Sequence, residues 1–147
     1  MRVLGLDLGE KRIGLALSDA EASIAFPAGF IVRTGLRRDL EALRDLVRDR
    51  GVARAVVGLP VHMSGRLGPE AENARRFAAA LAEAAGIPVD TLDERWTTVA
   101  AERTLREIEP SPRRRRPRGT VDAVAAALLL STYLERKRRV AAEPGTA

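Results

Sequence analysis

The sequence of 147 residues contains no cysteine, one histidine and only five aromatic side chains. Without cysteine there can be no disulfide, no zinc–thiolate site and no thiol nucleophile. The longest unbroken apolar run, 123–130, is far shorter than the roughly 20 residues that a membrane-spanning helix needs. Asp7 and Glu10 stand where an export signal would carry apolar residues, so we expect a cytoplasmic protein with no membrane partner.

Apolar and charged residues are both well represented, at 46% and 31% of the chain. This balance is typical of a soluble globular protein with a buried core rather than of a disordered chain. The length fits one domain. We expect that domain to span residues 1–139 and to be followed by a disordered tail over 140–147.

Positive charge is concentrated in one part of the chain. Residues 1–94 carry a net charge of −1, whereas residues 95–139 carry +7. This asymmetry indicates a polyanionic partner such as nucleic acid. Arginine outnumbers lysine 23 to 2 and alanine is abundant, so a bias in overall composition accounts for part of the basic character.

The pattern of apolar residues predicts an α/β fold with a mixed five-stranded sheet, an antiparallel meander plus parallel strands, flanked by helices. Residues 2–8 and 12–18 alternate as two strands of a hairpin, and Leu4, Leu6 and Leu8 share the face opposite Asp7. Further strands are predicted at 26–33, 54–59 and 87–92. Helices are predicted at 38–50, 70–85 and 97–108 and from Thr120, as N-cap, to about Arg139, with Gly-rich and Pro/Arg-rich loops at 61–69 and 110–119.

Acidic residues at three separate places suggest a metal site. Asp7 interrupts an apolar strand, Asp93 and Glu94 follow the last strand, and Asp122 falls in the first turn expected for the final helix. Taken alone, Asp122 also fits a favourable helix-dipole position, and Asp93–Glu94 fits a solvated turn. If all three places meet at the carboxyl ends of the parallel strands, their oxygens suit Mg²⁺ or Mn²⁺. Two such ions would activate water and stabilise the leaving oxygen in phosphodiester cleavage.

A run of arginines lies next to these acids in the sequence. Arginine side chains beside a metal site would hold phosphate groups by charge-assisted hydrogen bonds, although a solvated linker is the simpler alternative for the Pro-rich stretch. The predicted nucleic-acid-binding residues are Arg12, Arg95, Arg113, Arg114, Arg115, Arg116 and Arg118.

Four short motifs, in order and over residues 3 to about 134, make the chain resemble the YqgF family, also called RuvX. That family has an RNase H-like fold, is related to Holliday-junction resolvases, and is ascribed nuclease activity on pre-16S ribosomal RNA. The matching stretches are Gly5 to Gly14, Val57 to Pro60 with Gly65, Asp93 to Arg95 with Thr97 and Thr98, and Val121–Asp122 with Ala125 and Ala126.

The resemblance implies that Asp7, Glu94 and Asp122 are the catalytic, metal-binding acids of a metal-dependent nuclease, a hydrolase acting on ester bonds. It implies that Arg12 and Arg95 meet phosphate or brace the acids. The substrate would be the 5′ end of pre-16S ribosomal RNA or, alternatively, branched DNA, with the ribosome as a further partner and a monomer or homodimer as the working form. His62 stands where we expect asparagine in many relatives, so no role is assigned to it.

Two other classes of protein fit parts of the sequence. The turn after Asp7 resembles the first phosphate loop of sugar kinases and actin, but the chain is too short for two such domains and has no GxxxxGK[ST] or GxGxxG run. A non-catalytic RNA- or ribosome-binding module would need exposed aromatics, and most of the five stand at apolar periodic positions that predict burial. Trp96, beside Arg95, is the one candidate for base stacking, and packing of the following helix is the favoured alternative.

Overall fold

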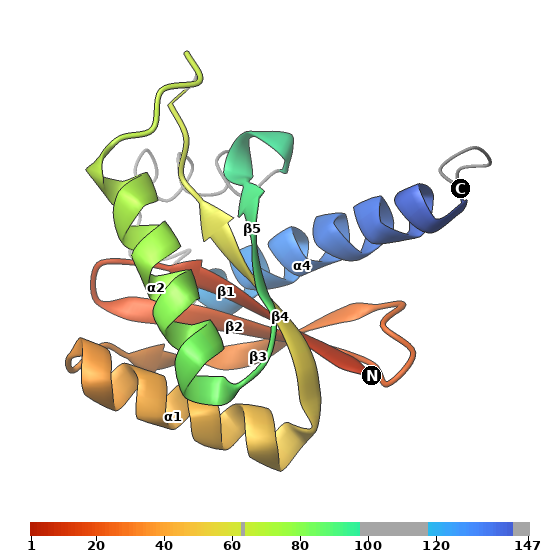
Figure 1. Cartoon of the computed structure of the whole chain (residues 1–147), viewed down its shortest axis with the longest axis horizontal. Coiled ribbons are helices and arrows are strands. Elements are labelled where there is room, and N and C mark those ends of the chain that lie inside the picture. Colours follow the sequence, from red (N-terminus) through yellow and green to blue (C-terminus); the bar gives the residue numbers. More distant parts are fainter. Residues whose placement is uncertain (63, 98–117, 143–147) are drawn as a thin grey trace, which may run out of the picture.

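The computed structural model describes residues 1–62, 64–97 and 118–142. Five strands, three α-helices and one short 3₁₀ helix lie in these ranges (Figure 1). The strands are β1 (Arg2–Leu8), β2 (Arg12–Ser18), β3 (Ala25–Val32), β4 (Val52–Leu59) and β5 (Val89–Asp93). The helices are α1 (Leu36–Arg50), α2 (Pro69–Ala85), η1 (Glu94–Trp96) and α4 (Arg118–Ala142).

The five strands form one mixed sheet in the order β3-β2-β1-β4-β5. β1 pairs antiparallel with β2, and β2 with β3, whereas β1, β4 and β5 are parallel. The predicted fold class and the predicted hairpin are therefore confirmed. Because β1, β4 and β5 run in the same direction, their carboxyl ends meet at one edge of the sheet, where sites gather in open α/β folds.

Helices cover both faces of the sheet (Figure 1). α1 and α2 pack on the face that carries Leu4 and Leu6 of β1, and their core includes Leu43, Phe77 and Leu81. α4 packs on the opposite face, which carries Val3 of β1, Ala16 of β2 and Val56 of β4. Its buried side chains there are Ala125, Ala126, Leu129, Leu130, Tyr133 and Leu134. Asp7 shares the parity of Val3, so the alternation of β1 directs it to the α4 face.

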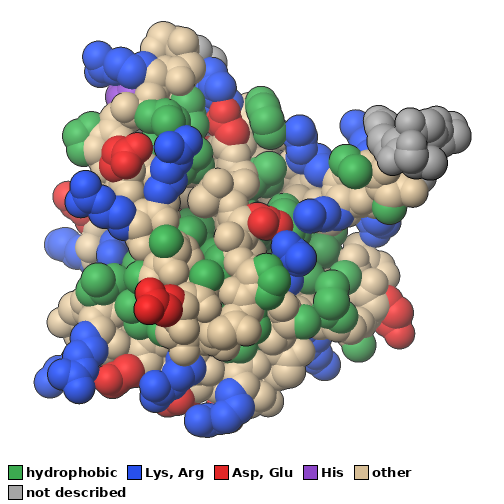
Figure 2. Space-filling model, viewed as in Figure 1, with side chains coloured by type: hydrophobic (Ala, Val, Ile, Leu, Met, Phe, Trp, Pro, Cys, Tyr) green, Lys and Arg blue, Asp and Glu red, His purple; other side chains and the backbone are tan. Residues whose placement is uncertain are grey.

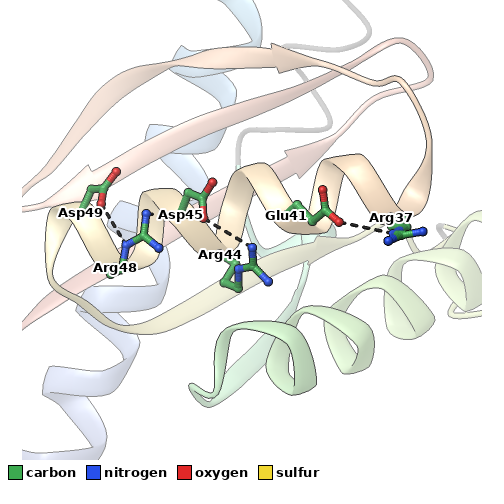
Figure 3. A network of polar contacts seen from close by, with 6 residues as sticks. All are labelled: Arg37, Glu41, Arg44, Asp45, Arg48 and Asp49. Carbon is green, nitrogen blue, oxygen red and sulfur yellow. Dashed lines mark hydrogen bonds and ion pairs between the residues drawn. The ribbon is translucent and has the colours of Figure 1, made fainter.

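The outer surface of α1 is a solvated, charged face. Arg37 pairs with Glu41 at 3.3 Å and Arg48 with Asp49 at 3.2 Å, in a row of opposite charges along the helix (Figure 3). Exposed pairs of this kind contribute about 0–1 kcal/mol each. The helix is therefore held on the sheet mainly by its buried side, which includes Leu43 and Val47.

The start of α4 differs from the sequence prediction. The helix begins at Arg118 rather than after a Thr120 cap, so residues 118 and 119 are helical and not part of a loop. In the sequence Pro117 stands immediately before the helix, and proline is common near helix starts, where its missing N–H costs no intrahelical hydrogen bond. Gly119 inside the first turn costs only about 1 kcal/mol relative to alanine. Asp122 consequently lies one turn into α4 and not in its first turn, so the helix-dipole explanation for it is weak.

The remaining boundaries agree with the predictions within two residues, except the last. α4 continues to Ala142, three residues past the predicted end, and residues 143–147 lie outside the described part of the chain. Thr97, the expected first residue of a helix over 97–108, has an extended backbone and closes η1 instead; the rest of that predicted helix lies outside the described residues. No helix in the described ranges is long and apolar enough to cross a bilayer.

Candidate active site

Asp7 is a buried carboxylate near the carboxyl end of β1. It is only 2% exposed, and its neighbours in the strand are apolar. Burying a carboxylate costs several kcal/mol unless its oxygens gain new partners. The side chain points to the α4 face of the sheet, so its partners must come from α4 or from residues that follow the neighbouring strands.

Two glycines flank Asp7 on the neighbouring strands. Gly14 of β2 pairs directly with Asp7, and Gly58 of β4 follows Val57, the partner of Leu6. Glycine in a strand interior often marks a place where another group approaches closely. The missing side chains thus leave room on both sides of the Asp7 carboxylate.

Asp122 fills the space over Gly14. A Cβ atom on Gly14 would lie 2.1 Å from the backbone oxygen of Asp122 and 3.0 Å from its Cβ. Asp122 is 6% exposed, and its Oδ2 accepts a hydrogen bond of 2.9 Å from Nε of Arg12, on the same strand as Gly14. The glycine brings α4 onto β2, and the arginine fixes the direction of the carboxylate.

Glu94 fills the corresponding space over Gly58. A Cβ atom on Gly58 would lie 2.7 Å from Oε1 of Glu94 and 3.3 Å from its Cγ. Glu94 is 4% exposed, although it is the first residue of a short 3₁₀ turn at the end of β5. Its backbone oxygen accepts hydrogen bonds from the backbone N–H of Thr97 at 3.1 Å and from the Thr97 hydroxyl at 3.0 Å. These hydrogen bonds close the turn, and Glu94 points inward from it.

The three predicted acids thus lie on one face of the sheet, around its carboxyl-terminal edge. Asp7 lies between two glycines, and the other two acids occupy the space that these glycines leave. They belong to β1, η1 and α4, elements that are far apart in the sequence. Within residues 1–62, 64–97 and 118–142, however, no three acidic or histidine side chains are arranged closely enough to hold a metal ion. Joint metal ligation by these three carboxylates stays a prediction.

Arg95 lies at the outer rim of this edge, next to Glu94. Its guanidinium makes a forked contact with Asp93: Nη2 is 2.7 Å and Nε 3.0 Å from Oδ2. Asp93 Oδ1 also accepts the backbone N–H of Arg95 at 2.9 Å and so caps the turn. These hydrogen bonds from Arg95 hold the pKa of Asp93 below its ordinary value, and Asp93 raises the pKa of Arg95. Asp93 therefore positions an arginine, and Glu94 is the acid that points inward.

The loop after β4 reaches the same rim. Val61 and Leu67 form an isolated antiparallel bridge, and a Cβ on Gly65 would lie 3.7 Å from Nη1 of Arg95. His62 is exposed, and its Nε2 would be 2.8 Å from a Cβ on Gly68. The imidazole therefore lies over its own loop.

The other predicted phosphate-binding arginines divide into two groups. Arg12 lies against Asp122, as described, and Arg118 is the first residue of α4. Arg113, Arg114, Arg115 and Arg116 lie outside the described residues. Sequence reasoning missed the spacing role of Gly14 and Gly58, although a glycine inside each apolar strand was a signal for it.

Comparison with known proteins identifies the family of the chain. The sequence profile described as "RuvX: Holliday junction resolvase" matches residues 1–136. The chain is 51% identical over 136 residues to a Moorella thermoacetica protein named "Putative pre-16S rRNA nuclease", covering 92% of this chain and 96% of that one. A Chloroflexus aurantiacus protein of the same name is 45% identical over 136 residues, covering 92% and 88%.

Among solved structures, Thermus thermophilus RuvC in complex with a Holliday junction substrate superposes with a TM-score of 0.59 at 20% identity, covering 93% of this chain and 96% of that one. At this identity the likeness concerns the fold alone. The fold is RuvC-like, and the predicted RNase H-like fold is therefore confirmed. Taken with the profile match and the identities above, the chain belongs to the RuvX family.

Proposed function

We propose that this chain is a divalent-metal-dependent nuclease that hydrolyses phosphodiester bonds at the 5′ end of pre-16S ribosomal RNA in the cytoplasm. The name carried by its relatives supports the substrate, and the site supports the chemistry. The observation that carries the proposal is the burial of Asp7 between Gly14 and Gly58, the two positions over which Asp122 and Glu94 lie.

The donor set fits Mg²⁺ or Mn²⁺. Asp7, Glu94 and Asp122 offer only carboxylate oxygens, which are the ligands that these hard cations prefer. These residues would hold the ions, two by analogy with other phosphodiester-cleaving sites, and the bound ions would supply an activated water and stabilise the leaving oxygen. Each of the three carboxylates is almost fully buried, and a bound cation would offset the cost of burying its negative charge.

The surrounding side chains have supporting tasks. Arg12 holds Asp122 in one orientation and neutralises part of the negative charge before a cation arrives. Arg95, fixed by Asp93, presents its partly exposed guanidinium beside Glu94 and is suited to bind a phosphate oxygen of the substrate. α4 and the sheet exclude water from the inner side of the three carboxylates.

The test compares wild type with Asp7→Asn, which keeps the shape of the side chain and removes its charge. Purified proteins are incubated with 5′-labelled pre-16S RNA and with four-way DNA, with and without Mn²⁺. Asp45→Asn, at an α1 residue on the opposite side of the sheet, is the matched control. We expect wild type and Asp45→Asn to cleave the RNA only with Mn²⁺, and Asp7→Asn to bind RNA without cleaving it.

Each other outcome has a definite meaning. Cleavage by Asp7→Asn at the wild-type rate would remove Asp7 from the site. Paired symmetrical cuts in the four-way DNA, with the RNA intact, would replace the proposed substrate by branched DNA. RNA binding without cleavage, and with no Mn²⁺-dependent rise in melting temperature, would leave a non-catalytic binding module instead of a nuclease.

A further inference from the structure

The tryptophan that follows the candidate active site is exposed. Trp96, the one candidate for base stacking, is 55% exposed, and Phe26 and Phe30 are 52% and 43% exposed, so the predicted burial is wrong for these two phenylalanines. Phe26 and Phe30 lie on the edge strand β3, whereas Trp96 lies in η1, two residues after the buried Glu94. A single exposed aromatic is common on protein surfaces, so its meaning depends on what surrounds it.

Arg136 of α4 lies over the ring of this tryptophan. Its guanidinium carbon is 4.0 Å from the centroid of the Trp96 ring, although the two residues belong to different elements. Arg136 is itself exposed. An exposed cation–π contact of this kind contributes little to folding stability, yet it keeps a cationic group and an aromatic plane together at the surface.

The turn that carries Trp96 is closed by hydrogen bonds at both ends. Asp93 caps it through the N–H of Arg95, and Thr97 closes it on the backbone oxygen of Glu94. These contacts set the backbone position of Trp96 two residues after Glu94, and Arg136 is the side chain that lies over its indole. Stacking sites need this kind of order, because a mobile aromatic loses conformational entropy when a base binds.

Basic side chains continue from this contact along α4. Arg136, Lys137, Arg138 and Arg139 follow one another where the helix projects beyond the sheet (Figure 1), and blue side chains line that projection in Figure 2. Only Arg136 lies against the ring, whereas Lys137, Arg138 and Arg139 contact Asp90, Ser23 and Glu135, so the positive charge beside Trp96 comes from Arg136 and from the preceding residue, Arg95. A ligand that combines a flat aromatic group with negative charge is complementary to this surface, and nucleic acid has both.

We infer that Trp96 and Arg136 form a stacking subsite for one unpaired nucleobase, next to the phosphate that lies at the carboxylate site. This inference rests on the proposed function, since it assumes a nucleic-acid substrate. The base stacks on the indole, and the guanidinium either covers the base or binds its phosphate. A base inside a duplex has both faces occupied, so the subsite favours single-stranded or unstacked segments over continuous duplex.

The first experiment uses the fact that Trp96 is the only tryptophan of the chain. Wild-type protein without divalent cations is titrated with a short single-stranded RNA, with the same RNA carrying abasic sites, and with a duplex of the same length. We expect the single strand to quench tryptophan fluorescence at saturation, and the abasic strand and the duplex to bind with much weaker quenching. Equal quenching by all three ligands would overturn the inference.

The second experiment measures affinity by anisotropy of a labelled single strand. Replacement of a stacking aromatic by alanine weakens binding by about 5-fold to 100-fold. We expect a loss in that range for Trp96→Ala, substantial recovery in Trp96→Phe, and a smaller loss for Arg136→Met. Arg139→Met removes the same charge from the same helix and pairs in wild type with Glu135, so it serves as the control. Affinity unchanged in Trp96→Ala, or reduced equally by both arginine variants, would contradict the subsite.

Melting temperatures separate this role from a structural one. If Arg136→Met lowers the melting temperature and leaves affinity and quenching unchanged, the contact with Trp96 only ties α4 to η1, and the inference fails. If Trp96→Ala does not fold, the titration of wild type and the Trp96→Phe variant decide the question. These experiments measure binding and not cleavage, so they test the subsite separately from the proposed nuclease. If the single strand quenches Trp96 but the protein cleaves no RNA, the nuclease is refuted and the subsite stands. If the protein cleaves RNA but Trp96 does not respond to the base, the nuclease stands and the subsite is refuted.

Discussion

Arg12 on β2 and Asp122 on α4 are joined by a hydrogen bond of 2.9 Å between residues that are 110 positions apart in the sequence. The carboxylate side chain is 9% exposed and the arginine 25%, so the pair is largely shielded from water. It lies two residues along β2 from Gly14, where α4 comes closest to the sheet. One contact therefore both attaches the last helix and orients a predicted metal ligand.

Replacing Arg12 with methionine keeps much of the apolar stem and leaves Asp122 without this donor. We expect the free energy of unfolding to fall by about 1–3 kcal/mol, the cost of losing a hydrogen bond to a buried charged group. Urea denaturation measures it. Arg12→Lys keeps the charge but lacks the planar guanidinium, so we expect its free energy of unfolding to lie between those of wild type and Arg12→Met. An unchanged urea midpoint in Arg12→Met would show that the pair does not hold α4.

Alanine substitutions at the two glycines beside Asp7 should have different effects. A Cβ on Gly14 meets the backbone oxygen of Asp122 at 2.1 Å, so α4 must move, and we expect a loss of about 3 kcal/mol or more. A Cβ on Gly58 meets the end of the Glu94 side chain, which can rotate away, so we expect a loss of about 1 kcal/mol.

Gly58→Ala should affect cleavage much more strongly than stability. Because this variant displaces the Glu94 carboxylate, we expect its cleavage rate to fall at least about 10-fold while most of its stability is kept. Thermal unfolding and single-turnover cleavage of labelled RNA, measured on the same samples, check both statements. Full activity in Gly58→Ala would show that Glu94 is not needed in its observed position.

The sequence alone predicted the sheet and most helix positions, because they depend on local periodicity. Alternation placed Asp7 on the face opposite Leu4 and Leu6, and this is confirmed. The start of α4 was missed because a capping residue was sought at Thr120, while the actual start follows a proline. Helix ends depend on such competing local signals, and so they are less predictable than helix existence.

The contacts that shape the site could not be predicted from local patterns. Nothing near Gly58 in the sequence says that Glu94 will lie over it, since that proximity depends on the pairing of β4 with β5 and on the turn after β5. The exposure of Trp96 and its contact with Arg136 depend in the same way on where α4 crosses the sheet edge. Family resemblance predicts which acids form the site, but the spacing of those acids is a tertiary property.

Tyr133 on α4 donates a short hydrogen bond to Asp90 of β5, which also accepts one of 3.0 Å from Arg54 of β4. Burial, and then the bond to Asp90, raises the pKa of Tyr133 above its ordinary value near 10. We expect Tyr133→Phe to lower the free energy of unfolding by about 1–2 kcal/mol at neutral pH.

The raised pKa of Tyr133 also fixes the direction of a pH effect. Its contribution to stability is complete below about pH 10, the unfolded value, and is lost as the pH rises toward the higher folded value. The stability difference between wild type and Tyr133→Phe should therefore shrink in strongly alkaline solution. Chemical denaturation at several pH values measures it, and a difference that grows with pH would contradict this assignment.

Asp93 provides an acid-side test of the turn that holds Glu94. Its hydrogen bonds from Arg95 hold its pKa below the ordinary value of about 3.9, so the stabilisation is present above that pH and is lost as the pH falls through the lower folded value. The fluorescence of Trp96, in the same turn, should follow this titration with a midpoint below about 3.9. Arg95→Met should raise the midpoint toward 3.9, whereas Arg48→Met, on the outer face of α1, should leave it unchanged. A midpoint that Arg95→Met does not move would mean that the Asp93–Arg95 contact does not order the turn in solution, and the inward direction of Glu94 would then need another cause.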